Sequence, residues 1–109
     1  MIEIKAIVDE EGLLRACGVT GHAGAGPKGG DIVCAAVSVL ARTGAEVLSN
    51  RTGIRVLQEA PQRGVFWMEI DCAPKEKDFL FGAGTFLLEG LKSVSQEYPD
   101  YCSMTIWRN

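Results

Sequence analysis

The sequence predicts an α+β fold, a two-layer sandwich in which two helices pack on one face of a mixed, mostly antiparallel sheet. Segments of alternating apolar and polar residues, typical of strands, occur in pairs, and a longer stretch with helical spacing follows each pair. A chain of 109 residues also has room for only one hydrophobic core. We therefore expect the order β-β-α-β-β-α-β in a single domain, residues 1–109.

The first two strands are predicted to form a hairpin. Residues 2–8 alternate between apolar and polar side chains, which is the period of a strand with one buried face. The sequence Asp9-Glu10-Glu11-Gly12 then predicts a turn, and residues 13–20 follow as the second strand. Because four residues are too few for a crossover connection, the two strands should be antiparallel.

The first helix is expected to begin after Asp31, which is a favourable N-cap residue, and to end between Asn50 and Gly53. Apolar residues recur at helical spacing along it, so we expect one face to pack on the sheet. This predicted stripe consists of Ile32, Ala36, Val39, Leu40, Thr43 and Val47.

The second half of the chain repeats this pattern. Residues 54–57 and 65–72 are predicted strands joined by a turn at 61–64, and residues 102–107 form the last strand. Between them, a helix after Pro74 should end at Tyr98-Pro99. Its predicted apolar stripe consists of Phe79, Ala83, Phe86, Leu87, Gly90, Leu91 and Val94.

Three glycines in this second helix are unusual, because each lowers helix propensity by up to about 1 kcal/mol. They are Gly82, Gly84 and Gly90. Close backbone packing would offset that cost. We therefore expect a helix–helix or dimer contact along this helix.

Composition excludes several classes of protein. With 47% apolar and 23% charged residues, the chain is typical of a folded globular domain. The net charge is −3 and there is no basic block, so nucleic acid is not an expected partner. No uninterrupted apolar run approaches the roughly 18 residues of a membrane span, and the N-terminus lacks a signal-peptide profile. We expect a cytoplasmic protein without a membrane partner.

The four cysteines are expected to be free thiols, because nothing indicates secretion and the apolar content suffices for a core. They are widely spaced, no CxxC motif occurs, and the chain has one histidine. The spacing of zinc ligands is therefore absent. We expect neither a metal nor a cofactor.

A glycine-rich loop is the strongest functional signal. The chain has 13 glycines, where average usage predicts about eight. The surplus is concentrated between the second strand and the first helix, at Gly21, Gly24, Gly26, Gly29 and Gly30. Such a loop permits positive φ angles and the close approach of a substrate backbone.

Cys34 and His22 flank this loop and are the candidate catalytic residues. Cys34 would be the third residue of the predicted helix, where the positive end of the helix dipole favours a thiolate. His22 is the only imidazole that can act as its base. Amides at the helix start, including that of Cys34, are candidates for an oxyanion hole. The alternatives are a buried structural cysteine and a surface histidine without a task.

Three further residues have weaker signals. Asp31 is expected to cap the helix and is also a candidate to orient His22. Ser38 lies one turn after Cys34 on the same helix face, either in a supporting role or as an ordinary helical serine. Cys72, just ahead of the Pro74 helix, is a competing nucleophile.

A rival interpretation of the loop is nucleotide binding, because residues 24–29 match GxGxxG between a strand and a helix. Two features disfavour it. The preceding strands are predicted to form a hairpin, and Pro27 removes one of the amides that would bind phosphate.

The segments Gly21-His22-Ala23 and 29–38, with the spacing between them, closely resemble the ribosomal-processing cysteine protease Prp family. The resemblance implies a small bacterial endopeptidase that removes the N-terminal extension of large-subunit ribosomal protein twenty-seven, a step in ribosome assembly. It also implies His22 and Cys34 as catalytic residues, and a homodimer. The alternative is a non-catalytic ribosome-assembly or peptide-binding module whose loop holds a partner.

Overall fold

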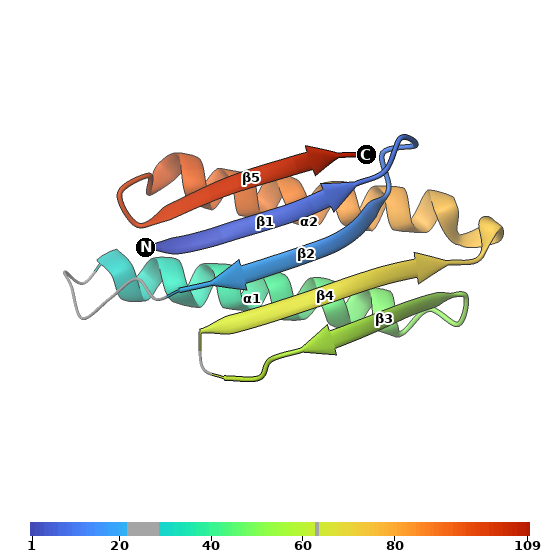
Figure 1. Cartoon of the computed structure of the whole chain (residues 1–109), viewed down its shortest axis with the longest axis horizontal. Helices are drawn as coiled ribbons and strands as arrows, with labels where there is room; N and C mark the ends of the chain where they lie inside the picture. Colours follow the sequence, from blue (N-terminus) through green and yellow to red (C-terminus); the bar gives the residue numbers. More distant parts are fainter. Residues whose placement is uncertain (22–28, 63) are drawn as a thin grey trace.

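The computed structural model describes residues 1–21, 29–62 and 64–109, except for the side chains of residues 29–31. Five strands form one sheet in the order β3-β4-β2-β1-β5, and both helices cover the same face of it (Figure 1). The predicted fold class and element order are confirmed. The elements are β1 (Ile2–Val8), β2 (Leu14–Thr20), α1 (Gly29–Ser49), β3 (Ile54–Glu59), β4 (Val65–Cys72), the short 3-10 helix η1 (Pro74–Glu76), α2 (Lys77–Glu97) and β5 (Cys102–Arg108).

The sheet is mixed in one place. β1 pairs with β2 as an antiparallel hairpin and with β5 in parallel, from Ile2 against Cys102 onward. β4 pairs antiparallel with both β2 and β3. The turn between β1 and β2 includes Gly12 at a φ of 85°, a conformation that favours glycine.

The core lies between the sheet and the two helices. The alternating side chains Ile2, Ile4, Ala6 and Val8 of β1 are all buried, as their period predicts. The intervening residues of β1 lie on the face that no helix covers. An antiparallel sheet with one solvated face commonly shows this alternation.

Helix α1 corrects the sequence prediction in two respects. It begins at Gly29, so Asp31 is its third residue rather than its N-cap. The stripe that packs on the sheet is also a different one, because Ile32 and Val39 are 58% and 54% exposed. The buried residues are Val33, Val37, Ala41, Ala45 and Leu48.

The predicted stripe differs from the buried one because α1 has apolar residues on two neighbouring sides. Apolar spacing alone cannot determine which of the two sides packs on the sheet. The sheet takes the side with the small residues Ala41 and Ala45, which permit the helix to approach closely. On its flank, Gly44 gives room to Leu87 of α2. A Cβ at Gly44 would lie 2.8 Å from the Leu87 Cδ2 atom.

Helix α2 is rotated in a similar way from the predicted stripe. Leu87 and Leu91 are buried as expected, but Leu80 is also buried, whereas Phe86 is 76% exposed. Gly84 faces the core, where an added Cβ would lie 3.0 Å from the Leu14 Cβ. The side of α2 that contains Leu80 and Gly84 therefore packs on the sheet, and Phe86 is exposed to solvent.

An ion pair joins the end of α1 to the start of α2. Arg51 donates two hydrogen bonds to the Glu76 carboxylate, from Nε at 3.0 Å and Nη2 at 3.1 Å. The Glu76 side chain is 11% exposed, and the Arg51 guanidinium stacks 4.2 Å from the Phe79 ring centroid. A bidentate pair of this kind is stronger than an exposed ion pair.

We predict that Glu76→Ala lowers the free energy of unfolding by about 2 kcal/mol, because it leaves Arg51 without its two acceptors. Urea denaturation followed by circular dichroism measures the change. The matched control is Glu11→Ala, which removes an exposed ion pair with Lys77 and should change stability by less than about 0.5 kcal/mol. Equal effects of the two substitutions would contradict this role of Glu76.

Candidate functional site

The end of β2 and the start of α1 lie at the same end of the molecule, where the glycine-rich segment connects them (Figure 1). Gly21 follows β2 and has a φ of 97°. Its amide donates a hydrogen bond to the Gly64 carbonyl at 2.9 Å, and a Cβ at this position would collide with the Met1 carbonyl oxygen. Glycine is therefore required at residue 21, and its contacts fix where the chain leaves the sheet.

Cys34 is half-buried and packs against the hydrophobic core. It is the sixth residue of α1, whereas an N-cap at Asp31 would have made it the third. Its own amide therefore lies inside the hydrogen-bonding ladder of the helix, whereas the amides of residues 29–31 in the first turn lack acceptors within the helix. These amides replace that of Cys34 as candidate oxyanion-hole donors.

Ser38 lies one helical turn beyond Cys34 and is exposed. Arg42 follows after another turn, and its Nε donates a hydrogen bond to the Ser38 carbonyl at 3.3 Å. Cys34 and Ser38 lie on the side of α1 turned away from α2, because the residues that meet α2 are Leu40 and Gly44. This arrangement agrees with the prediction that Ser38 lies on the same face of the helix as Cys34.

Several predicted site residues lie outside the described part of the chain. They are His22, Gly24 and Gly26, together with the side chain of Asp31. The backbones of Gly29 and Gly30 form the first two residues of α1. The Cys–His dyad and the orienting role of Asp31 therefore stay predictions.

Burial separates the four cysteines, which are all free thiols. Cys17 and Cys102 are buried, and burial raises the pKa of the Cys17 thiol to about 12 and also raises the pKa of Cys102. A thiol that stays protonated is a poor nucleophile. Cys34 and Cys72 are each half-buried, so they are the two accessible candidates.

The position of Cys72 argues against it as the nucleophile. It is the last residue of β4, and η1 separates it from α2, which begins only at Lys77. The sequence placed Cys72 just ahead of a helix, but the structure puts η1 between Cys72 and α2, so Cys72 does not lie at the start of α2. Gly21, which precedes His22 in the sequence, contacts Gly64 beside the opposite end of β4. The seven steps along the strand from Val65 to Cys72 span roughly 23 Å.

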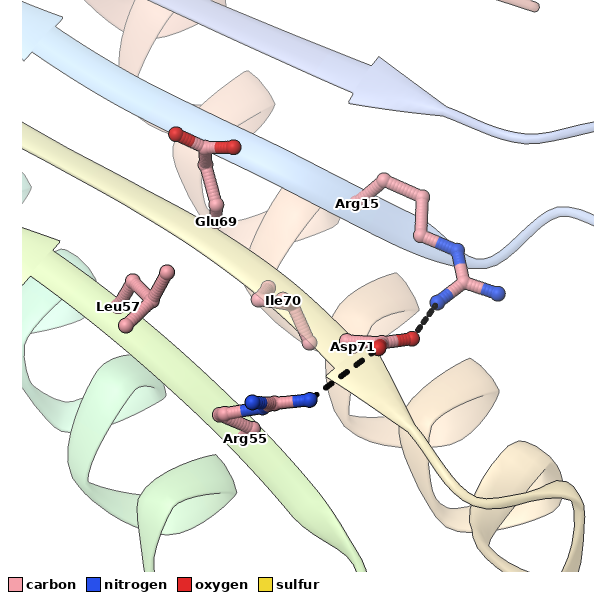
Figure 2. A pocket seen from close by; sticks show the side chains of 6 residues that line it. All are labelled: Arg15, Arg55, Leu57, Glu69, Ile70 and Asp71. Carbon is pink, nitrogen blue, oxygen red and sulfur yellow. Dashed lines mark hydrogen bonds and ion pairs between the residues drawn. The ribbon is translucent and has the colours of Figure 1, made fainter.

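A hollow of about 370 Å³ lies on the face of the sheet that the helices leave open (Figure 2). Asp71 lies between two arginines that line it, 3.4 Å from Arg15 Nη1 and 3.8 Å from Arg55 Nη2 (Figure 2). Arg15 also pairs with Asp9 at 2.8 Å. These charges compensate one another. The hollow is separate from the Cys34 site because it lies on the face of the sheet opposite α1. The hollow is lined by Arg15, Arg55, Leu57, Glu69, Ile70 and Asp71.

Comparisons with known proteins identify a family and a fold. The family model for cysteine protease Prp matches residues 1–103. SMU.848 from Streptococcus mutans is 28% identical, with a TM-score of 0.82 over 100% of this chain and 96% of that one. No curated protein sequence matches the chain.

Two crystal structures of the essential ribosomal processing protease Prp from S. aureus are also similar. One contains a substrate peptide and the other a covalently linked product peptide. They are 22% and 23% identical to this chain, each with a TM-score of 0.81 over 97% of this chain and 99% of the other. At this identity the likeness supports the fold.

We predict that iodoacetamide modifies Cys34 and Cys72 in the native protein at least about tenfold faster than Cys17 and Cys102, because burial keeps the latter pair protonated and inaccessible. Peptide mass spectrometry after timed quenching measures the four rates. The same reaction in urea is the control, since unfolding should make the rates similar. Rapid labelling of native Cys17 would contradict the assignment.

Proposed function

The chain belongs to the cysteine protease Prp family, and from this premise we propose that Cys34 is its nucleophile and His22 its general base. The observation that carries the proposal is the position of Cys34. It is an accessible thiol near the start of α1, at the end of the molecule where the chain leaves β2 toward His22. The competing thiol, Cys72, is the last residue of β4, whereas Gly21 contacts Gly64 beside the first residue of that strand.

In the proposed reaction, His22 takes the proton of the Cys34 thiol, and the thiolate attacks the carbonyl carbon of a peptide bond. The amides at the start of α1 hold the resulting oxyanion, and their contribution is electrostatic. The C–N bond then breaks, and the leaving amine takes the proton from His22. Water hydrolyses the thioester and regenerates the free thiol. These steps use only groups of this chain and require no cofactor.

Asp31 and Ser38 are proposed as supporting residues. Asp31 belongs to the first turn of α1, where a negative charge is favourable, and its proposed role is to orient His22. Ser38 presents an exposed hydroxyl on the Cys34 side of the helix. Gly21, Gly24, Gly26, Gly29 and Gly30 are proposed to admit the substrate backbone, because glycine has no side chain to exclude it.

We propose that the substrate is a large-subunit ribosomal protein, number twenty-seven, whose N-terminal extension is removed during ribosome assembly in the cytoplasm. The name of the S. aureus relatives and the peptides bound to them support a peptide substrate of this class. The resemblance at residues 21–38 supports it as well. As the resemblance also implies, we propose that the enzyme works as a homodimer.

We predict that Cys34→Ala and His22→Ala each lower kcat/KM by at least about a thousandfold, because each removes one member of the dyad. The assay incubates the purified variants with the ribosomal protein carrying its extension and follows the shortened product by mass spectrometry. Cys72→Ala is the matched control, since it removes the other accessible thiol and should retain wild-type activity.

Retained cleavage by Cys34→Ala, or its loss in Cys72→Ala, would refute the assignment of the nucleophile. Tight binding of the ribosomal protein by the wild type without cleavage would instead favour a non-catalytic peptide-binding module.

A further inference from the structure

The start of β4 touches the chain at the point where β2 ends. The last residue of β2, Thr20, pairs with the first residue of β4, Val65. One residue beyond this pair, the Gly21 amide donates a hydrogen bond to the Gly64 carbonyl at 2.9 Å. This contact extends the pairing of the two strands toward the end of the molecule where α1 begins (Figure 1).

The other side of Gly21 is closed by the beginning of β1. Thr20 pairs with Glu3 on that side. Beyond this pair, a Cβ at Gly21 would collide with the Met1 carbonyl oxygen, so this carbonyl lies close against the Gly21 backbone. Gly21 is therefore held between the ends of two neighbouring strands, and its backbone has little room to move.

Gly64 presents its carbonyl through a conformation that favours glycine. Its φ is 82°, in the left-handed region. The Val65 amide donates to the Gln62 carbonyl at 3.2 Å, which is a hydrogen bond typical of a tight turn. Such a turn accounts for a glycine at position 64. It does not account for the hydrogen bond that the Gly64 carbonyl accepts from the end of β2.

This contact bears on the chemistry because Gly21 is the residue before His22. Consecutive Cα atoms are about 3.8 Å apart, so a shift of Gly21 carries over to the backbone of the proposed general base. The proposed nucleophile is held independently, since Val33 and Val37, which flank Cys34 on α1, are 0% and 1% exposed. Proton transfer requires its donor and acceptor within about 3 Å, and a misplacement of about 1 Å can lower a rate by about a hundredfold.

We propose that Gly64 is a positioning residue for the cleavage reaction. Its carbonyl holds the Gly21 amide, and it thereby sets where the chain leaves the sheet toward His22. Gly64 acts through Gly21 and not on the reacting atoms. The inference deepens the proposed function and rests on it for the roles of His22 and Cys34.

The competing explanation is that Gly64 serves only the stability of the β3–β4 hairpin. Gly12 supplies the matched control, because it belongs to the turn of the β1–β2 hairpin and has a φ of 85°. It lies at the opposite end of the sheet from Gly21 (Figure 1). A Cβ strains the backbone at either glycine, whereas only Gly64 accepts the hydrogen bond of Gly21.

Kinetics of three variants separate the two explanations. Gly64→Ala should lower kcat for cleavage of the ribosomal protein by about tenfold or more, because the strained carbonyl shifts the base. Gly64→Asn should keep kcat within about threefold of the wild type, since asparagine adopts a positive φ more readily than alanine. Gly12→Ala should keep the wild-type kcat. Circular dichroism and urea denaturation report the folded fraction, to which each kcat is normalised.

A second measurement reports on the dyad without substrate. The rate at which iodoacetamide modifies Cys34 is followed over a pH series by peptide mass spectrometry. His22→Ala should raise the pH of half-maximal rate by about one unit or more, because it removes the imidazolium that stabilises the thiolate. Gly64→Ala should raise this pH part of the way, and Gly12→Ala should leave it unchanged.

The hydrogen bond alone is removed when an ester replaces the amide between Thr20 and Gly21, in protein assembled by ligation at Cys17 and Cys34. This variant keeps both glycines and their freedom at positive φ. It should reproduce the lower kcat and the raised half-maximal pH of Gly64→Ala, with circular dichroism confirming that it folds.

Wild-type kcat and half-maximal pH in Gly64→Ala or in the ester variant would overturn the proposal, as would equal losses of kcat in Gly12→Ala and Gly64→Ala. A half-maximal pH that moves in His22→Ala alone would refute the role of Gly64 and leave the dyad intact. A half-maximal pH that does not move in His22→Ala would instead refute the dyad, and the role of Gly64 with it.

Discussion

The packing of one side of α1 on the sheet is the constraint on which the rest of this structure depends. Val33, Val37 and Leu48 are almost fully buried there, so the rotation of the helix about its axis is determined. That rotation places Cys34 on the flank away from α2, half-buried and still accessible. The same rotation turns a second apolar stripe outward, since Ile32 and Val39 are exposed.

Stability and chemistry are separated along the length of the molecule. The Arg51–Glu76 pair, with the Phe79 ring, secures the end where α1 finishes and α2 begins. The proposed site lies at the other end, where β2 finishes and α1 begins (Figure 1). An ion pair and a packed ring suit the first task, whereas a glycine-rich connection between two fixed elements suits a site that must admit a peptide backbone.

The sequence was a good guide to secondary structure and a poor guide to helix orientation. Strand alternation in β1 predicted its buried residues, because a strand has only two faces. In α1 the period selected Ile32 and Val39, which are exposed, because an apolar helix offers several sides and the correct one depends on the partner surface. The start of α1 differs from the prediction because the N-cap preference of Asp31 is only a local tendency, and the helix includes Gly29 and Gly30 despite their low helix propensity.

The sequence by itself determined the element order, the family resemblance and the pair of residues proposed for catalysis, because these depend on local spacing and residue chemistry. Only the tertiary structure decided which thiols are accessible. Cys17 and Cys102 are buried by strands and helices distant in the sequence, and that burial raises their pKa values. It also decided which glycines of α2 serve the fold, since Gly84 faces Leu14 and Gly90 faces Leu40. The burial of a side chain depends on how the sheet and the helices pack together, so a local sequence pattern cannot predict it.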